Sequence, residues 1–260
     1  MVWSFSRVNS YNNCPYGWKL HYLDDKSQEG SGFADWGSLC HSIFEDYANG
    51  TLEEYEMLGA YDERYPQYMK NDYPPCRGLP LADRYYERGR EIFSSFAGFP
   101  AGWEIIGSEI KVEMRIRGRR FIGYIDLLVR DREDGKLIVI DHKSKGRFNS
   151  KEEQDSYAIQ LYLYAYWVWL NYHEYPKELI FNMFRAGDTV HIPFEEEKME
   201  QALDWFENTI NQIYSDVDFW DKIALKYEET GKLLSDFKKD DFFCNYLCGS
   251  RTHCSRSIFG

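Results

Sequence analysis

The sequence has no hydrophobic run long enough to cross a membrane. Its longest apolar stretch, LYLYAYWVWL, has about half of the ~20 residues that a bilayer span requires. The opening MVWSFSRVNSY also lacks the basic and then apolar pattern of a secretory signal. We therefore expect a cytoplasmic protein without a membrane partner.

Positive charge is scarce, because 31 Lys and Arg residues stand against 43 Asp and Glu residues and the formal net charge is -12. Such a balance excludes a protein that coats nucleic acid by bulk charge, since that binding depends on Lys and Arg at phosphates. Two local basic segments, KVEMRIRGRR at 111–120 and KSKGR at 143–147, leave room for a basic face. The sequence also has no Walker A loop, so no ATP-driven motor is expected on this chain.

Cysteine is sparse as well, with six residues at positions 14, 40, 76, 244, 248 and 254. Disulfide frameworks belong to small secreted domains, so free thiols or a metal site suit a chain of 260 residues better. Apolar residues, by contrast, make up 43% of the chain, which is ample for a packed core.

Hydrophobic periodicity predicts an α/β fold in which helices flank a central mixed β-sheet. Three segments with period two follow one another and are joined by the turns RGR and DREDGK. A first helix with Ser4 or Ser6 as N-cap is separated from a second helix by a Cys-Pro break. Further helices are predicted at 34–48, about 81–97, 151–172 and 195 to about 214, and strands at 105–118, 119–131, 136–144, 178–185 and 188–194.

One predicted strand, LIVI at 137–140, ends abruptly in Asp141, His142 and Lys143. Burying these charges costs several kcal/mol unless they are paired. Since alternate strand residues point the same way, Asp141 and Lys143 share a face, and Asp126 lies at the centre of the preceding strand. Two carboxylates and the His142 carbonyl would suit Mg²⁺ or Mn²⁺, beside a lysine that stabilises charge on a phosphate. The alternative is a salt-bridged strand end.

Two helices carry polar residues at helical spacing. Gly37, His41 and Glu45 form one stripe on the helix at 34–48, where the histidine is either a metal ligand or an ordinary structural residue. Gln160 and Tyr164 are one turn apart on the otherwise aromatic helix at 151–172. A buried amide such as Gln160 needs a hydrogen-bond partner, which the carboxylates or a substrate phosphate could supply.

The motifs GSLCHSIFE, Glu109, GYID, DHK and QLYLY, in this order, resemble the RecB-like branch of the PD-(D/E)XK nuclease superfamily. The opening FSRVNSYNNCPYGWKLHYL resembles its iron–sulfur members, namely AddB nuclease domains and CRISPR-associated RecB-like exonucleases. The likeness covers about residues 4 to 254. It implies one nuclease domain over 1–260, with a restriction-endonuclease-like core at about 34–194 and cluster-binding ends at about 1–24 and 195–260.

The resemblance also implies roles for single residues. The implied metal ligands are His41, Asp126, Asp141 and the His142 carbonyl; the implied catalytic groups are Asp126, Asp141, Lys143, Gln160 and Tyr164; Glu45 and Glu109 are implied as supporting groups around the ligands. In the implied reaction, water activated by Mg²⁺ or Mn²⁺ attacks a DNA phosphodiester in line.

Four cysteines, Cys14, Cys244, Cys248 and Cys254, match those that bind a four-iron, four-sulfur cluster in the iron–sulfur members and join the chain ends there. The last three run Cys-x3-Cys-x5-Cys, whereas the relatives usually have two residues in the first gap. Thiolates in fours also hold Zn²⁺, and His253 beside Cys254 keeps this alternative open. Cys40 and Cys76 are expected to be ordinary thiols.

The function implied is that of a metal-dependent DNA exonuclease acting on single-stranded ends, in recombination and repair, CRISPR adaptation or phage DNA processing. It would work in a bacterial, archaeal or phage-infected cell, alone or with a helicase, recombination or CRISPR-integration partner. The alternatives are a catalytically silent module that binds DNA ends and a structural zinc protein. Candidate DNA-binding residues are Arg115, Arg117, Arg119, Lys145 and Arg147, although the three strand arginines could equally guard a solvated strand edge.

Overall fold

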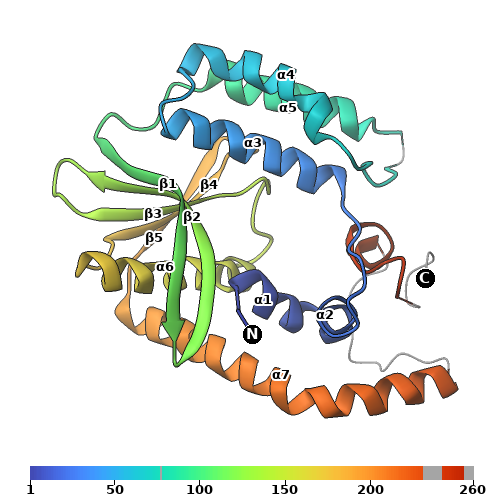
Figure 1. Ribbon diagram of the computed structural model, residues 1–260. Helices are drawn as coiled ribbons and strands as arrows, with labels where there is room; N and C mark the ends of the chain where they lie inside the picture. Colours follow the sequence, from blue (N-terminus) through green and yellow to red (C-terminus); the bar gives the residue numbers. More distant parts are fainter. Residues whose placement is uncertain (77, 231–241, 255–260) are drawn as a thin grey trace. The chain divides into compact units, whose positions relative to one another are not determined.

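The computed structural model describes residues 1–76, 78–230 and 242–254 (Figure 1). The elements in chain order are α1 (Phe5–Asn13), α2 (Pro15–Tyr22), α3 (Gly32–Ala48), the 3₁₀-helix η1 (Glu54–Glu56), α4 (Met57–Tyr68), α5 (Leu81–Ser95), β1 (Trp103–Ile116), β2 (Arg119–Asp131), β3 (Leu137–His142), α6 (Lys151–Tyr172), β4 (Glu178–Met183), β5 (Asp188–Pro193), α7 (Glu196–Thr230) and the π-helix η2 (Phe243–Leu247).

The chain divides into two compact units. The first contains residues 1–31, 115–120 and 203–260, and the second contains residues 32–114 and 121–202. The second unit therefore holds most of the sheet together with α3, α4, α5 and α6. No helix among the described residues is long and apolar enough to cross a membrane.

A five-stranded mixed sheet is the centre of the second unit, and its strand order is β1-β2-β3-β4-β5. β3 pairs antiparallel with β2 and parallel with β4, while β4 pairs antiparallel with β5. All six residues of β3 are buried, as the run LIVI predicts for a central strand. Because β3 and β4 are parallel, their carboxyl ends lie at the same edge of the sheet.

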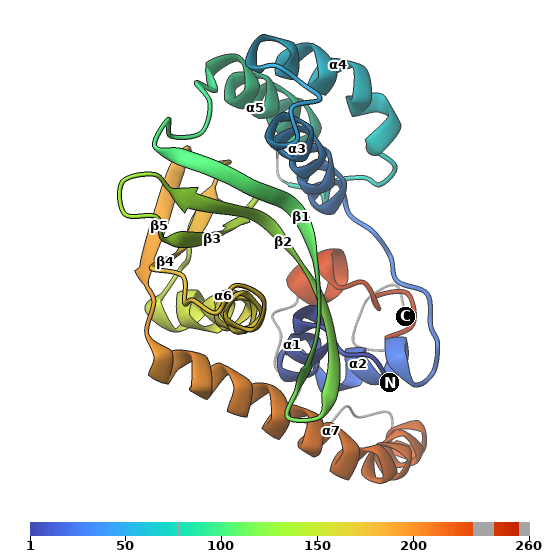
Figure 2. The same cartoon turned by 60° about the vertical axis from the view of Figure 1, so that its left-hand side comes forward.

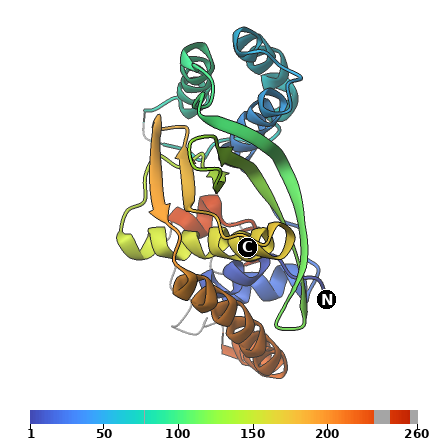
Figure 3. The same cartoon turned by 90° about the vertical axis from the view of Figure 1, so that its left-hand side faces the viewer.

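Helices cover both faces of this sheet in the second unit: α3 lies over one face and α6 over the other (Figures 1, 2 and 3). On the α3 side, five apolar residues pack with Ala48 at the end of α3. They are Leu127, Val129, Ile138, Ile140 and Ile180. Since residues alternate between faces, Asp126, Asp141 and Lys143 start from the opposite face, toward α6.

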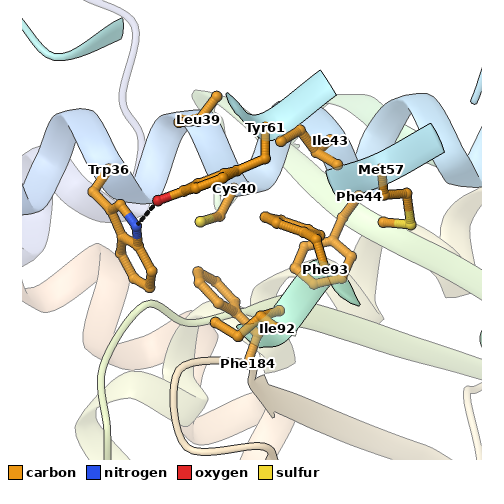
Figure 4. Packing of buried hydrophobic residues seen from close by; sticks show 10 residues of the cluster. All are labelled: Trp36, Leu39, Cys40, Ile43, Phe44, Met57, Tyr61, Ile92, Phe93 and Phe184. Carbon is orange, nitrogen blue, oxygen red and sulfur yellow. Dashed lines mark hydrogen bonds between the residues drawn. The ribbon is translucent and has the colours of Figure 1, made fainter. Parts of the chain in front are cut away.

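A second core joins α3 to α4 and α5, where Trp36, Tyr61 and Phe93 are surrounded by aliphatic and aromatic side chains (Figure 4). The Trp36 indole donates a hydrogen bond to the Tyr61 hydroxyl over 3.0 Å. A Cβ at Gly89 would lie 2.2 Å from the Tyr61 ring, so only glycine lets α5 approach this tyrosine. Cys40 is fully buried here, and burial raises the pKa of its thiol, as befits an ordinary structural cysteine.

The first unit brings the start of the chain to residues 243–254. Ser4 caps α1 by accepting from the Arg7 amide, as predicted. Residues 28–30 contact the C-terminal segment through hydrogen bonds. Gln28 Nε2 donates to Ser250 Oγ over 2.9 Å, and the Glu29 backbone amide donates to the Gly249 carbonyl over 2.7 Å. These two segments are therefore neighbours despite a separation of 222 residues between Gln28 and Ser250.

The α/β class, the mixed five-stranded sheet and the flanking helices are confirmed, and the arrangement is consistent with a restriction-endonuclease-like fold. Two helices differ from the prediction. α4 was not predicted; it contains Gly59 and Pro66, and the proline removes one backbone hydrogen bond two residues before the helix ends. α7 continues to Thr230 instead of ending near residue 214.

Candidate metal centre

The carboxylates of Asp126 and Asp141 meet at the carboxyl end of β3. The β2–β3 register pairs Leu127 with Ile140, so the next position places Asp126 opposite Asp141. At this end β3 is still paired with β4, His142 with Asn182, and the His142 amide donates to Asp126 Oδ2 over 2.6 Å. Asp141 is only 3% exposed, so both acids are held near one strand end with little access to bulk water.

Helix α3 supplies an imidazole to the same point. His41 Nδ1 lies 3.7 Å from Asp126 Oδ2, and the His41 ring centre lies 5.7 Å from that of His142. One turn earlier on the stripe, a Cβ at Gly37 would lie 3.3 Å from Ser144 Oγ. Glycine at position 37 thus allows α3 to pass close to the segment after β3, which brings His41 within reach of the acids.

Glu109 of β1 completes the group, because ligand atoms of His41, Glu109 and Asp126 all lie within 4.8 Å of one another. Sequence reasoning had given Glu109 only a supporting role. Its backbone has φ of +48°, a left-handed conformation that is rare within a strand and that redirects the side chain. No residue pattern signals such a conformation at a glutamate. Glu45, the other predicted supporting acid, lines the adjoining cavity.

Lys143 is held from two sides. Its Nζ lies 2.7 Å from Asp141 Oδ2 and donates to Gln160 Oε1 over 3.2 Å. Gln160 in turn donates to the Tyr164 hydroxyl over 2.9 Å. A Cβ at Gly123 would lie 2.8 Å from the Tyr164 ring, so the glycine of the GYID motif lets α6 approach β2. The two helix residues predicted to support the lysine are therefore connected to it.

Burial and like charge make the acids hard to ionise while no cation is bound. Burial and the neighbouring Asp141 charge raise the pKa of Asp126 well above its usual value of 3.8. Burial, Glu45 and Asp141 likewise raise the pKa of Glu109. Burial lowers the pKa of His41, which keeps the imidazole neutral and able to bind a metal. A divalent cation would relieve the repulsion among the acids.

The donor set fits a hard divalent cation. Three carboxylates, one neutral imidazole and the His142 carbonyl are oxygen and nitrogen donors of the kind that Mg²⁺ and Mn²⁺ accept. In addition, Asp141 Oδ2 is buried and makes no hydrogen bond of good geometry, although the Lys143 ammonium is close to it. A buried carboxylate oxygen without such a bond is unusual and is suited to a metal ligand.

A cavity of about 450 Å³ adjoins these groups, and Phe33, Gly37, His41, Glu109 and Ser144 are among the residues that line it. Its volume is typical of small-ligand sites. The candidate ligands therefore border a space that a substrate can enter.

The family model for the PD-(D/E)XK nuclease superfamily matches residues 2–255. The chain belongs to this superfamily. A search of curated proteins returned no match. Membership supports a nuclease function, and nucleases of this superfamily typically use divalent metals, in agreement with the cluster of His41, Glu109 and Asp126.

The side chain of His142 has a structural role in this PD-(D/E)XK nuclease. It faces away from Asp141, as the strand alternation predicts, and its ring packs 5.0 Å from Phe44 and 6.3 Å from Phe99. Asn182 Nδ2 lies 2.9 Å from His142 Nδ1, so the neutral ring accepts there and carries its proton on Nε2. The sequence had predicted this orientation of the side chain and assigned a metal-binding role only to the carbonyl of His142.

The candidate DNA-binding arginines of the β1–β2 hairpin have partners within the first unit. Arg117 Nη2 lies 3.1 Å from Asp204 Oδ1, Arg119 donates to Asn211 over 3.2 Å, and Arg115 donates to the Gly118 carbonyl over 3.0 Å. These contacts give the three arginines roles in the fold of the nuclease, and contact with DNA stays a prediction for them.

The two basic candidates after β3 differ from each other. Lys145 pairs with Glu153 on α6, so much of its charge is used within the protein. Arg147 is exposed, and no carboxylate among the described residues pairs with it.

The four terminal cysteines all belong to the first unit of the nuclease. Cys14 ends α1 and caps α2, where its Sγ accepts from the Gly17 amide over 3.4 Å. Cys14 and Cys248 line one cavity of about 330 Å³. No three of the cysteines of the described segments are within 4.8 Å of one another. The structure thus brings two of the predicted cluster ligands to a common cavity.

Proposed function

We propose that the protein is a Mg²⁺- or Mn²⁺-dependent DNA exonuclease of the RecB-like branch that degrades single-stranded ends. The observation that carries this proposal is the convergence of His41, Glu109 and Asp126 beside Asp141 and Lys143. Asp141 has an ion-pair partner in Lys143. Glu109 and Asp126, however, converge with a neutral imidazole, and no Lys or Arg of the described residues forms an ion pair with them, which is unfavourable unless a cation joins them.

Each group has a task in this proposal. His41, Glu109, Asp126, Asp141 and the His142 carbonyl would hold the cation. A bound divalent cation lowers the pKa of a coordinated water and neutralises charge that develops on a phosphate. Lys143, held by Asp141 and Gln160, presents an ammonium group that stabilises the same negative charge. Tyr164 fixes the Gln160 amide, so that the lysine keeps one orientation.

Two parts of this proposal rest on the resemblance to RecB-like exonucleases. They are the preference of the enzyme for strand ends and its role in recombination and repair, CRISPR adaptation or phage DNA processing. A helicase, recombination or CRISPR-integration protein would then supply DNA ends in trans, in the cytoplasm of a bacterial, archaeal or phage-infected cell. The test uses end-labelled linear single strands, linear duplexes and closed circular single strands. An exonuclease shortens the linear strands only with Mg²⁺ or Mn²⁺ and leaves the circles intact.

Lys143→Ala is expected to reduce cleavage about a hundredfold, the usual effect of removing one group that stabilises developing charge. Because lysine is no metal ligand, Mn²⁺ affinity measured by calorimetry should stay close to the wild-type value. Lys151→Ala, at an exposed lysine paired with Asp155, is the control and should cleave normally.

Two outcomes oppose the proposal. Full activity in Lys143→Ala would remove this lysine from the reaction. A wild-type protein that binds single-stranded DNA yet never shortens it with either cation would instead favour a silent module that binds DNA ends.

We also propose that Cys14, Cys244, Cys248 and Cys254 bind a four-iron, four-sulfur cluster. Four thiols from both ends of the sequence lie in one unit, and the amide-bonded Cys14 shares a cavity with Cys248. Cys14 lies at the N-terminus of α2, and its sulfur accepts a hydrogen bond from the Gly17 amide. The cluster would hold residues 14–30 against residues 244–254.

Wild-type protein purified without oxygen should then be brown and contain about four iron atoms per chain, with equal acid-labile sulfide. Cys14→Ser should lose colour and iron, whereas Cys76→Ser, at an exposed cysteine outside the set, should keep both. Colourless protein that contains zinc would show that the alternative metal is correct.

A further inference from the structure

A second cavity lies at the same edge of the sheet as the metal centre. β3 and β4 are parallel, and the chain continues from β3 into Lys143–Arg147 and from β4 into Phe184 and Arg185. A Cβ at Gly146 would lie 2.7 Å from Arg185 Nη2, so this guanidinium touches the segment that leaves the catalytic strand. The carboxyl ends of parallel strands are where α/β proteins commonly bind ligands.

Arg185 is held in place by contacts that leave its charge unpaired. Its guanidinium carbon lies 5.4 Å from the centre of the Tyr85 ring, and Nη1 donates to the Tyr85 hydroxyl. Its carbonyl accepts from Arg88 Nε over 2.7 Å. No carboxylate of the described chain pairs with Arg185. An arginine fixed in this way loses little conformational entropy when its remaining donors bind an anion.

The cleft beside Arg185 has a volume of about 650 Å³ and is lined mainly by α5. Arg84 projects from α5 with its side chain exposed and, like Arg185, has no carboxylate partner in the described part of the chain. Arg88 is already paired with Glu91 over 2.8 Å. Asp83 and Glu87 also border the cleft, so it has no strong positive field, and an anion must be recognised by directed hydrogen bonds from the two free guanidinium groups.

Residues that line the cleft contact, or lie close in sequence to, residues that line the metal-centre cavity. Phe33 lines the metal-centre cavity, and its ring lies 5.1 Å from that of Tyr85, which lines the cleft. On the other side, Ser144 lines the metal-centre cavity, and Gly146, two residues later, touches Arg185. A polymer with a phosphodiester at the metal centre would have to pass Phe33 and Gly146 to reach the cleft, and this is the path that we infer for it.

We propose, on the basis of the nuclease function above, that Arg185 and Arg84 bind phosphates of the same strand whose bond is cut at the metal centre. Guanidinium groups bind phosphate oxygens in pairs of parallel hydrogen bonds, which suits one arginine held by Tyr85 and a second, exposed arginine on α5. Cavities of about 450 and 650 Å³ are of small-molecule size, which suits the unpaired nucleotides of one strand. In this proposal the bound strand is single, and the two arginines fix its path.

Binding is tested in EDTA by the fluorescence anisotropy of a labelled oligothymidylate of about 12 nucleotides, a length within the range of single-strand sites. Arg185→Ala and Arg84→Ala should each raise Kd about tenfold and reduce the slope of log affinity against log salt by about 0.7, as expected for one lost phosphate contact. Arg185→Lys should lie between wild type and Arg185→Ala. Arg90→Ala is the control, because Arg90 lies on the same helix and pairs with Asp62 on α4, and it should bind like wild type.

Two binding results would overturn the proposal: wild-type affinity and salt slope in both alanine variants, or equal losses for a duplex of the same length. Arg84 is exposed, so Arg84→Ala remains decisive if Arg185→Ala fails to fold.

Cleavage assays distinguish a failure of this inference from a failure of the proposed nuclease function. With Mn²⁺, Arg185→Ala should slow degradation of a long single strand about tenfold more than hydrolysis of a dinucleotide, which has no further phosphate to place in the cleft. Equal slowing of both substrates contradicts the cleft and leaves the nuclease function standing. A wild-type protein that cuts neither substrate contradicts the nuclease function itself.

Discussion

Asparagine in place of Asp126 is expected to lower DNA cleavage by at least about a thousandfold, a loss of ~4 kcal/mol in transition-state stabilisation. The same change should make the metal-free protein more stable, because the buried Asp126 carboxylate is opposed by the Asp141 charge. Urea unfolding with EDTA measures the stability, and added Mn²⁺ should then stabilise the wild type much more than the variant.

The pH dependence gives this prediction a definite sign. The pKa of Asp126 is higher in the folded protein than its usual value of 3.8, because of burial and Asp141, so the folded state binds this proton more tightly. The difference between the unfolding free energies of wild type and variant should therefore favour the wild type most at low pH. It should shift towards the variant as pH rises from about 3.8 to the pKa of Asp126 in the folded protein. Asp134→Asn, at an exposed turn carboxylate, is the control for loss of one acid. A variant less stable than wild type in EDTA at neutral pH would show that Asp126 is a structural residue.

Replacing Glu109 by asparagine is expected to separate stability from metal binding. Glu109 adopts the left-handed region at φ of +48°, which asparagine tolerates better than glutamate or glutamine. In EDTA, Glu109→Asn should therefore be about 1 kcal/mol more stable than Glu109→Gln, since both lose the charge and only asparagine relieves the backbone strain. Both variants should lose most of their Mn²⁺ affinity and cleavage.

The paired design distinguishes the two roles of this residue. Equal stability of the two variants in urea would show that the conformation of residue 109 is not strained. Retention of wild-type Mn²⁺ affinity by Glu109→Gln, measured by calorimetry, would remove Glu109 from the ligand set.

Much of the site was predictable because its residues obey local periodicity. The LIVI run predicted a buried central strand, alternation placed His142 away from Asp141, and helical spacing joined Gln160 to Tyr164. The four-residue spacing on α3 likewise predicted that His41 would approach the acids one turn after Gly37. In each case, the geometry of one element decides where the side chain points.

Features that depend on contacts between elements were not predictable in this way. Glu109 joins the ligands only because its backbone leaves the regular strand conformation, which no pattern of residue types indicates. Arg117 and Arg119 resemble a nucleic-acid surface in the sequence, yet α7 provides Asp204 and Asn211 as partners. The cleft residue Arg185 drew no attention, since a lone arginine after a strand has no distinctive spacing.

The contacts between residues 28–30 and 249–251 have a consequence for how the chain is made. During synthesis, residues 32–202 are translated before residue 250, so the sheet and its helices can assemble first. The contacts of residues 28–30 form only after residues 249–251 have been made. Closing a loop of that length is slow, because chain entropy opposes contacts between residues so distant in sequence. The first unit therefore completes its contacts later than the second, and with the proposed cluster bound there, iron supply would limit how much of the protein completes it.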